Sequence, residues 1–240
     1  MIFFRKKIPN LLIRTDFHSH LIPGIDDGAK DMTHSLQLIK ELSNLGYRRL
    51  ITTPHIKNGQ YNNTIESIAD GMDMLRSELV QNNIDMHIAA SAEYYYDEAF
   101  LQAIIEDKLL HINRFVLFEF SYVVPPVNIE DMIYELKARN YTPVLAHPER
   151  YLYYHTKLDQ YEYLKNLGIY FQININSLAG HYGKSTKKVA KYLSEKGFID
   201  FVGSDVHNSK HINVLKDVIS DTEYKKIFNN NKILNDDLTI

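Results

Sequence analysis

Leu11-Leu12-Ile13 leads through Arg14-Thr15 into Asp16-Phe17-His18-Ser19-His20, so an apolar run ends in two histidines one residue apart. If this run is a β-strand, side chains alternate between its two faces, and His18 and His20 point the same way. Two imidazoles side by side on a rigid element can bind one metal ion together. The pair alone is weak evidence, because a short motif is only a hypothesis until its context supports it.

Apolar runs rich in β-branched residues alternate with amphipathic segments along the whole chain. Strands are predicted at residues 13–17, 49–53, 86–91, 115–119, 143–146, 170–175 and 199–203. Apolar residues at 3–4 spacing predict helices between them, at residues 36–43, 65–80, 98–106, 129–139, 159–166 and 186–196. Gly46, Gly168 and Gly197 each stand between a helix and a strand, as C-cap glycines do. Seven such alternations predict an α/β fold with parallel strands, as a closed barrel or an open sheet.

Composition narrows the class of protein. A chain of 240 residues with 45% hydrophobic residues can form one large domain, residues 1–240, and the tail from Asn229 is expected to be a loop or a frayed end. The net charge of −3 provides no general attraction for nucleic acid. The chain contains no cysteine, which excludes thiolate zinc sites and cysteine nucleophiles.

The sequence also gives expectations about location. It has no apolar run of about 18 residues, so no membrane span is expected. Residues 1–7 place their apolar side chains before their charges and lack the apolar stretch of a signal peptide. We therefore expect a frayed amino-terminal end and a cytoplasmic protein.

Polar residues suited to metal binding follow one predicted strand after another. They are His18, His20, Asp26, His55, Glu93, Glu119, His147, Asp205 and His207. Glu119 ends an otherwise apolar run, and a buried carboxylate needs a cation or hydrogen-bond donors. The carboxyl ends of parallel strands converge on one crevice, where the active sites of α/β proteins lie. One ion takes four to six ligands including water, so nine candidates indicate two or three ions, and such clusters suit phosphoester chemistry.

Arg150, three residues after His147, offers a planar guanidinium that matches the oxygens of a phosphate. Tyr122 and Tyr61 follow Glu119 and His55 and could form an aromatic wall for a phosphotyrosine ring. Helix–sheet packing, in a chain with 17 tyrosines, is the favoured explanation of these residues.

The motifs together resemble the polymerase-and-histidinol-phosphatase (PHP) superfamily. The matching stretches run from about residue 15 to residue 208: His18-Ser19-His20, Pro23-Gly24-Ile25-Asp26-Asp27-Gly28, Thr53-Pro54-His55, His147-Pro148-Glu149-Arg150-Tyr151 and Ser204-Asp205-Val206-His207-Asn208. Within the superfamily, the chain is similar to the manganese-dependent protein-tyrosine phosphatases encoded with bacterial capsule and exopolysaccharide machinery. The Pro-Gly-Ile-Asp-Asp-Gly and His-Pro-Glu-Arg-Tyr stretches are the parts specific to that branch.

The resemblance implies a single domain with a distorted seven-stranded (β/α) TIM-like barrel, a core at about residues 13–208 and a C-terminal helical segment and tail at 209–240. It implies up to three Mn²⁺ ions, with Fe or Zn as other possibilities. His18, His20, Glu93 and Asp205 would surround the first ion. Glu93 would bridge to a second, held also by Glu119 and His147, and Asp26, His55 and His207 would hold the third.

The resemblance also implies a reaction and a partner. A metal-bound hydroxide would be the nucleophile, and Arg150 would bind the phosphoryl oxygens. The usual substrate of the family is the autophosphorylated, tyrosine-rich C-terminal tail of a bacterial tyrosine kinase. Family members often carry an arginine a few residues after the Asp-x-His pair, whereas this chain has Lys210 and His211 there, and neither offers a bidentate fork. The sequence does not indicate an oligomeric state.

Three other readings are consistent with part of the pattern. The nearest is a PHP-type phosphoesterase for a small phosphomonoester such as histidinol phosphate, or a nuclease. A metal-dependent amidohydrolase also begins with His-x-His, but it commonly uses a carbamylated lysine where this chain has Glu119. A metal-stabilised scaffold that docks on a kinase would not need so many convergent polar residues.

Overall fold

The fold is that of a computed structural model, in which residues 11–240 are described, so the predicted frayed end at residues 1–7 lies outside the described residues. Within this range the chain forms nine strands: β1 (Thr15–Asp16), β2 (Arg49–Thr52), β3 (His55–Ile56), β4 (His87–Ala90), β5 (Glu93–Tyr95), β6 (Phe115–Glu119), β7 (Thr142–Ala146), β8 (Tyr170–Asn174) and β9 (Phe201–Gly203). Every pair of neighbouring strands in the two sheets is parallel. The prediction of an α/β fold is therefore confirmed.

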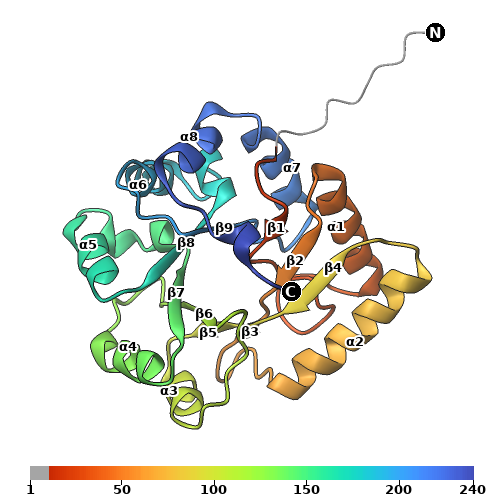
Figure 1. Ribbon diagram of the computed structural model, residues 1–240, viewed down its shortest axis with the longest axis horizontal. Coiled ribbons are helices and arrows are strands. Elements are labelled where there is room, and N and C mark those ends of the chain that lie inside the picture. Colours follow the sequence, from red (N-terminus) through yellow and green to blue (C-terminus); the bar gives the residue numbers. More distant parts are fainter. Residues whose placement is uncertain (1–10) are drawn as a thin grey trace.

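Helices surround the strands (Figure 1). Those of the described residues are α1 (Met32–Leu45), α2 (Ile65–Gln81), α3 (Glu98–Ile105), α4 (Ile129–Ala138), α5 (Asp159–Asn166), α6 (Lys184–Glu195), α7 (Ser209–Val218) and α8 (Thr222–Asn230). Short 3₁₀ turns lie at η1 (Pro148–Arg150), η2 (Leu152–Tyr154), η3 (Ile175–Ala179) and η4 (Asn235–Asp237). The three predicted cap glycines all have positive φ: Gly46, Gly168 and Gly197.

Seven of the nine strands overlap the predicted ranges, and the short strands β3 and β5, which follow β2 and β4 in the chain, were not predicted. Only Thr53 and Pro54 separate β2 from β3, and only Ser91 and Ala92 separate β4 from β5. Pro54 has no N–H to donate to a neighbouring strand. The hydrogen bonds therefore form two sheets, with the orders β1-β2-β4 and β3-β5-β6-β7-β8-β9, rather than one continuous barrel.

Hydrogen bonds also cross from the last strand to the first, just beyond their ends. The N–H of Asp205 donates to the carbonyl of His18 at 2.8 Å, and the N–H of His20 donates to the carbonyl of Val206 at 3.1 Å. The buried carboxylate of Asp16 accepts from both the N–H and the hydroxyl of Ser204, at 2.8 and 2.5 Å. These bonds support the predicted closure of the strands into a distorted barrel, which stays a prediction.

The interior between the strands is packed with apolar side chains. Phe17 and Phe201 stack with their ring centroids 4.2 Å apart, and Ile51, Leu117 and Val144 belong to the same cluster. A much larger cluster fills the space between the strands and the helices. The strand scaffold is therefore supported on both sides, which holds the strand ends in fixed positions.

The sequence predicts a loop or a frayed end for the tail from Asn229, and beyond the end of α8 at Asn230 the tail is a loop with one short 3₁₀ turn, but it is not frayed. Asn235 is fully buried, and its amide donates to the carbonyls of Thr15 and Val202 and accepts from the N–H of Val202, at 2.7–3.0 Å. The carboxylate of Asp236 accepts from the N–H groups of Arg14 and Thr15. The segment thus covers the amino ends of the strands, and the C-terminus lies near the middle of the ring of helices (Figure 1).

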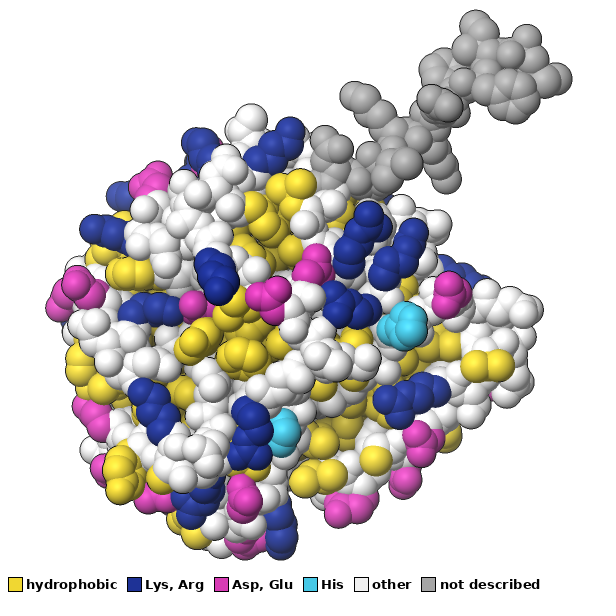
Figure 2. Space-filling model, viewed as in Figure 1, with side chains coloured by type: hydrophobic (Ala, Val, Ile, Leu, Met, Phe, Trp, Pro, Cys, Tyr) yellow, Lys and Arg dark blue, Asp and Glu magenta, His cyan; other side chains and the backbone are white. Residues whose placement is uncertain are grey.

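Figure 2 shows the side of the molecule on which this C-terminal segment lies. Basic and acidic side chains are interspersed over this face with hydrophobic ones between them, so the charges do not separate into areas of one sign.

No helix among residues 11–240 is both long enough and apolar enough to span a membrane.

Replacing Asn235 with alanine should destabilise the protein, because buried backbone groups of Thr15 and Val202 would lose their partners. We expect the free energy of unfolding to fall by about 2–4 kcal/mol, measured by urea denaturation. Asn229→Ala, at an exposed position of α8, is the matched control and should unfold like the wild type. Equal midpoints for Asn235→Ala and the wild type would show that the segment does not stabilise the strands.

Candidate metal centre

The predicted metal ligands come together at the carboxyl ends of the strands. Eight of the nine belong to four overlapping groups whose donor atoms lie within 4.8 Å of one another: His18, His20 and Asp205; His18, Glu93 and His147; His55, Glu93 and Glu119; and His20, Asp27, His55 and His207. The ninth, Asp26, belongs to none of these groups, whereas its neighbour Asp27 does.

The backbone turns sharply where two of these residues leave their strands. His147 directly follows β7 and has φ 34°, and Asp205 lies two residues after β9 and has φ 49°. Left-handed backbone is uncommon for residues other than glycine, and such strain is concentrated at functional sites. The turns leave both side chains buried beside Glu93 and His18.

His18 and His20 face each other with their Nε2 atoms 3.2 Å apart. The Nδ1 atom of His18 lies 2.7 Å from the side-chain oxygen of Gln172, and the Nδ1 atom of His20 lies 2.7 Å from a carboxylate oxygen of Asp26. When each Nδ1–H donates to its acceptor, each Nε2 keeps a free lone pair. One carboxylate oxygen of Glu93, Oε2, lies 3.1 and 3.4 Å from these two nitrogens. Facing lone pairs beside a carboxylate fit a bound cation.

Glu93 connects this group to the next. Its other oxygen lies 2.9 Å from Nε2 of His147. The Nδ1 atom of His55 is buried without a hydrogen-bond partner and lies 3.2 Å from Glu93 and 3.5 Å from Glu119. An orphaned ring nitrogen between two carboxylates is a second observation that fits a bound metal ion.

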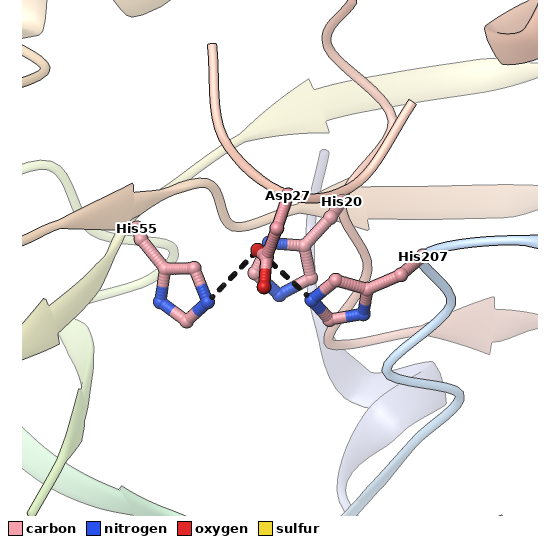
Figure 3. A group of neighbouring side chains, drawn as sticks. All are labelled: His20, Asp27, His55 and His207. Atoms are coloured by element: carbon pink, nitrogen blue, oxygen red, sulfur yellow. Dashed lines mark ion pairs between the residues drawn. The ribbon is translucent and has the colours of Figure 1, made fainter. Parts of the chain in front are cut away.

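The last group lies toward the solvent and is drawn in Figure 3. Oδ1 of Asp27 is 3.5 Å from Nε2 of His55 and 3.3 Å from Nε2 of His207, and the carboxylate points between the two rings. Asp27 is 54% exposed, whereas Asp26 is directed inward to His20 and also accepts from the N–H of Gly28 at 3.0 Å. The two acidic residues of the turn therefore differ in place: Asp27 lies among the candidate ligands, and Asp26 contacts the far side of the His20 ring.

The electrostatics of the two glutamates differ although they are close. Burial alone would raise the pKa of Glu93, but the rings of His18 and His55 and the hydrogen bond from His147 hold it well below its ordinary value. Burial and the negative charge of Glu93 raise the pKa of Glu119 well above its ordinary value. Bound cations would remove this conflict, since they favour the ionised form of both carboxylates.

Strand β8 contributes two residues that the motif reading missed. Gln172 holds His18 and donates at 3.0 Å to Asn174, whose amide donates at 2.6 Å to Asp205. This chain of bonds orients one imidazole and one carboxylate of the site. The contact between Gln172 and His18 requires glycine at position 203, because a Cβ atom there would lie 2.6 Å from Gln172 and 2.7 Å from His18.

A pocket of about 410 Å³ opens onto the donor groups. Arg150 lies in its wall, with Nη1 3.1 Å from Oδ2 of Asp205. Its guanidinium carbon lies 4.3 Å from the ring centroid of Tyr182 and 4.8 Å from that of Tyr122. Tyr61 also lines the pocket, stacked on His55 with the ring centroids 5.2 Å apart. The wall thus presents a positioned guanidinium among aromatic rings.

The two candidates for a second phosphate-binding residue are placed differently. His211 lines the pocket, and its Nδ1 lies 2.9 Å from the carbonyl of Asp205. Lys210 is exposed on the first turn of α7 and is not among the residues that line the pocket. His211 is therefore better placed than Lys210 to face a ligand.

Parallel strands that converge on clustered histidines and carboxylates are typical of polynuclear metal-dependent hydrolases. Residues 14–230 match the model of the family described as capsular polysaccharide synthesis, CpsB/CapC, and the chain belongs to this family. The predicted resemblance to capsule-associated phosphatases is thereby confirmed.

Relatives of known name agree with this membership. The tyrosine-protein phosphatase YwqE of Bacillus subtilis is 34% identical over 197 residues, which are 81% of this chain and 78% of that protein. A crystal structure described as that of YwqE and of CpsB from Streptococcus pneumoniae, unique metal-dependent tyrosine phosphatases, matches with a TM-score of 0.78 and 30% identity, over 91% of this chain and 96% of that one. A histidinol phosphate phosphatase from Lactococcus lactis, at 12% identity and TM-score 0.52 over 86% and 91% of the two chains, shares the fold alone.

Replacing Gln172 with alanine should weaken metal binding, because His18 would lose the acceptor that fixes its ring. Removing a hydrogen-bond partner of a metal ligand typically costs 10–100-fold in affinity, and we expect a loss of about 10-fold, measured by calorimetric titration of the metal-free protein with Mn²⁺. Gln102→Ala, exposed on α3, is the matched control. Unchanged Mn²⁺ affinity in Gln172→Ala would contradict a role for β8 in the site.

Proposed function

We propose that the chain is a metal-dependent protein-tyrosine phosphatase. The observation that carries this proposal is the pocket in which convergent histidine and carboxylate donors adjoin the guanidinium of Arg150. Membership of the CpsB/CapC family and the name of YwqE as a tyrosine-protein phosphatase support the choice of substrate.

The donor groups suggest how three divalent ions would be held. The first would lie among His18, His20, Glu93 and Asp205, the second among Glu93, Glu119 and His147, and the third among Asp27, His55 and His207. This differs from the sequence-based expectation in one residue, because Asp27 takes the place of Asp26. Bound ions of this kind supply an activated water and neutralise the charge of phosphoryl oxygens.

The protein side chains would bind and orient the phosphoryl group. Arg150 would donate two N–H groups to phosphate oxygens, since its planar fork matches their spacing. Tyr122 and Tyr182 stack on the guanidinium and limit its freedom. Asp205 turns Oδ2 toward Arg150 and Oδ1 toward His18 and His207, so it fixes the position of the guanidinium relative to the donor groups.

The identity of the metal is a separate proposal. Imidazole nitrogens and carboxylate oxygens without any thiolate suit Mn, Fe or Zn. We propose Mn²⁺, with up to three ions per chain, because the PHP motifs of this chain resemble those of manganese-dependent phosphatases. Fe and Zn remain compatible with the same donors.

We further propose that the phosphotyrosine substrate is the autophosphorylated C-terminal tail of a bacterial tyrosine kinase, met in the cytoplasm. The likeness to capsule-synthesis proteins supports this partner. We also propose one phosphatase domain for residues 1–240, with a core at about 13–208 and a C-terminal part at 209–240. The packing of Asn235 and Leu238 against the strands supports the single domain.

A phosphotyrosine peptide should be hydrolysed when Mn²⁺ is present and not after chelation with EDTA. His18→Ala should lower kcat/KM by at least about 100-fold, because it removes a donor shared by two groups. Phosphoserine peptide and histidinol phosphate are the comparison substrates. Turnover of histidinol phosphate without turnover of the peptide would favour a small-molecule phosphoesterase, and no phosphatase activity in metal-loaded protein would favour an amidohydrolase or a scaffold.

Arg150 should not be replaceable by lysine. We expect Arg150→Ala to lower kcat/KM for phosphotyrosine by about 100-fold, and Arg150→Lys to recover little of this loss, since an ammonium lacks the planar fork that lies over the rings of Tyr122 and Tyr182. The inhibition constant of inorganic phosphate should rise in both variants. Arg76→Ala, on the exposed face of α2, is the control. Full activity in Arg150→Lys would show that only the charge matters.

A further inference from the structure

Exposed apolar side chains are concentrated in one short loop, which we call the rim loop (residues 121–127) and which joins β6 to α4. Its sequence is Ser-Tyr-Val-Val-Pro-Pro-Val. Val123 is 83% exposed, Val124 62% and Val127 74%, and Tyr122 is 40% exposed. Four of the eleven large hydrophobic side chains that are exposed among residues 11–240 thus lie within six consecutive residues. An exposed apolar cluster of this kind indicates an interaction surface.

The rim loop is held in place by hydrogen bonds at both ends. The hydroxyl of Tyr153 donates to the carbonyl of Ser121 at 2.9 Å, and the hydroxyl of Tyr96 donates to the carbonyl of Val127 at 2.7 Å. The hydroxyl oxygen of Ser121 accepts from the N–H groups of Val123 and Val124 at 3.2 Å. The two prolines in between restrict φ. The valines are therefore presented to solvent by a constrained backbone, which lowers the entropy cost of binding.

The rim loop is continuous with the pocket. Tyr122 lines the pocket, stacks on His147 with the ring centroids 5.8 Å apart and lies beneath the guanidinium of Arg150. Val123 is the next residue in the chain, so the apolar cluster begins where the pocket wall ends. A phosphotyrosine whose phosphoryl group reaches Arg150 would bring its neighbours in the peptide to this rim. Elsewhere the rim is polar, with Lys57 and Gln60 among the lining residues.

We propose that Val123, Val124 and Val127 bind an apolar side chain adjacent to the phosphotyrosine of the substrate protein, so that the enzyme selects phosphotyrosines with apolar neighbours. This inference rests on the proposed function and adds a specificity surface to it. The occupant is a phosphotyrosine segment because the cluster adjoins the phosphate-binding wall. A second copy of the chain and a membrane surface are the other possible occupants of the rim loop, and the experiment must distinguish them from a phosphotyrosine segment.

The test compares two phosphotyrosine peptides, one with valine or leucine on both sides of the phosphotyrosine and one with glycine and serine there. The wild-type protein with Mn²⁺ should prefer the first peptide. Val123→Ser combined with Val124→Ser should lower kcat/KM for that peptide by about 10-fold, mainly through KM, because the apolar contact area is lost. Hydrolysis of free phosphotyrosine should be unchanged.

The matched control is Val80→Ser, since Val80 is 77% exposed near the carboxyl end of α2 and therefore close to the amino ends of the strands, away from the pocket. No peptide preference in the wild type, or an equal loss on free phosphotyrosine in the double variant, would overturn the inference. The inference would also be overturned if the double variant kept the peptide kinetics of the wild type but differed from it in mass by light scattering or in sedimentation with anionic vesicles. If the wild type hydrolyses neither of the two peptides nor free phosphotyrosine, the proposed function itself is wrong.

Discussion

The approach of two imidazole nitrogens is the constraint on which the site depends. His18 and His20 direct their Nε2 atoms at each other across 3.2 Å because Gln172 and Asp26 hold their opposite nitrogens. Without a positive charge between them, the two lone pairs and the carboxylate of Glu93 would repel one another. Three neighbouring features keep this arrangement in place: the side-chain amides of β8, the space left by glycine at position 203, and the salt bridge between Asp205 and Arg150.

The fold supports this arrangement by bringing the two ends of the strand series together. His18 and His20 follow the first strand, and Asp205 and His207 follow the last, so the four residues are neighbours because hydrogen bonds join the segments just beyond β1 and β9. Asp16 belongs to the same junction, where burial raises the pKa of its carboxyl to about 6 although the bonds from Ser204 oppose that rise. The backbone contacts that bring the two ends of the strand series together therefore also assemble the site.

The α/β fold and most of the candidate metal ligands could be predicted from the sequence. Apolar runs that end in His-x-His and Asp-x-His indicate a strand by their period of two, and a metal site by their residue types. What could not be predicted is equally physical. Gln172 and Asn174 look like ordinary polar residues of a strand, and only the fold shows which ligands they orient. Asp26 and Asp27 lie in one turn, where no periodicity indicates which side chain turns inward. The order of the tail depends on Asn235, whose partners are distant in sequence.

Asn235 has a consequence for how the chain acquires its fold. Its amide joins the carbonyl of Thr15 to that of Val202, across sequence separations of 220 and 33 residues. Such distant contacts form late, because a long loop must close before they contribute. During synthesis the carbonyl of Thr15 in the first strand therefore lacks the amide of Asn235 until that residue has left the ribosome. We expect nascent chains shorter than this to expose the edge of β1 and to depend on chaperones.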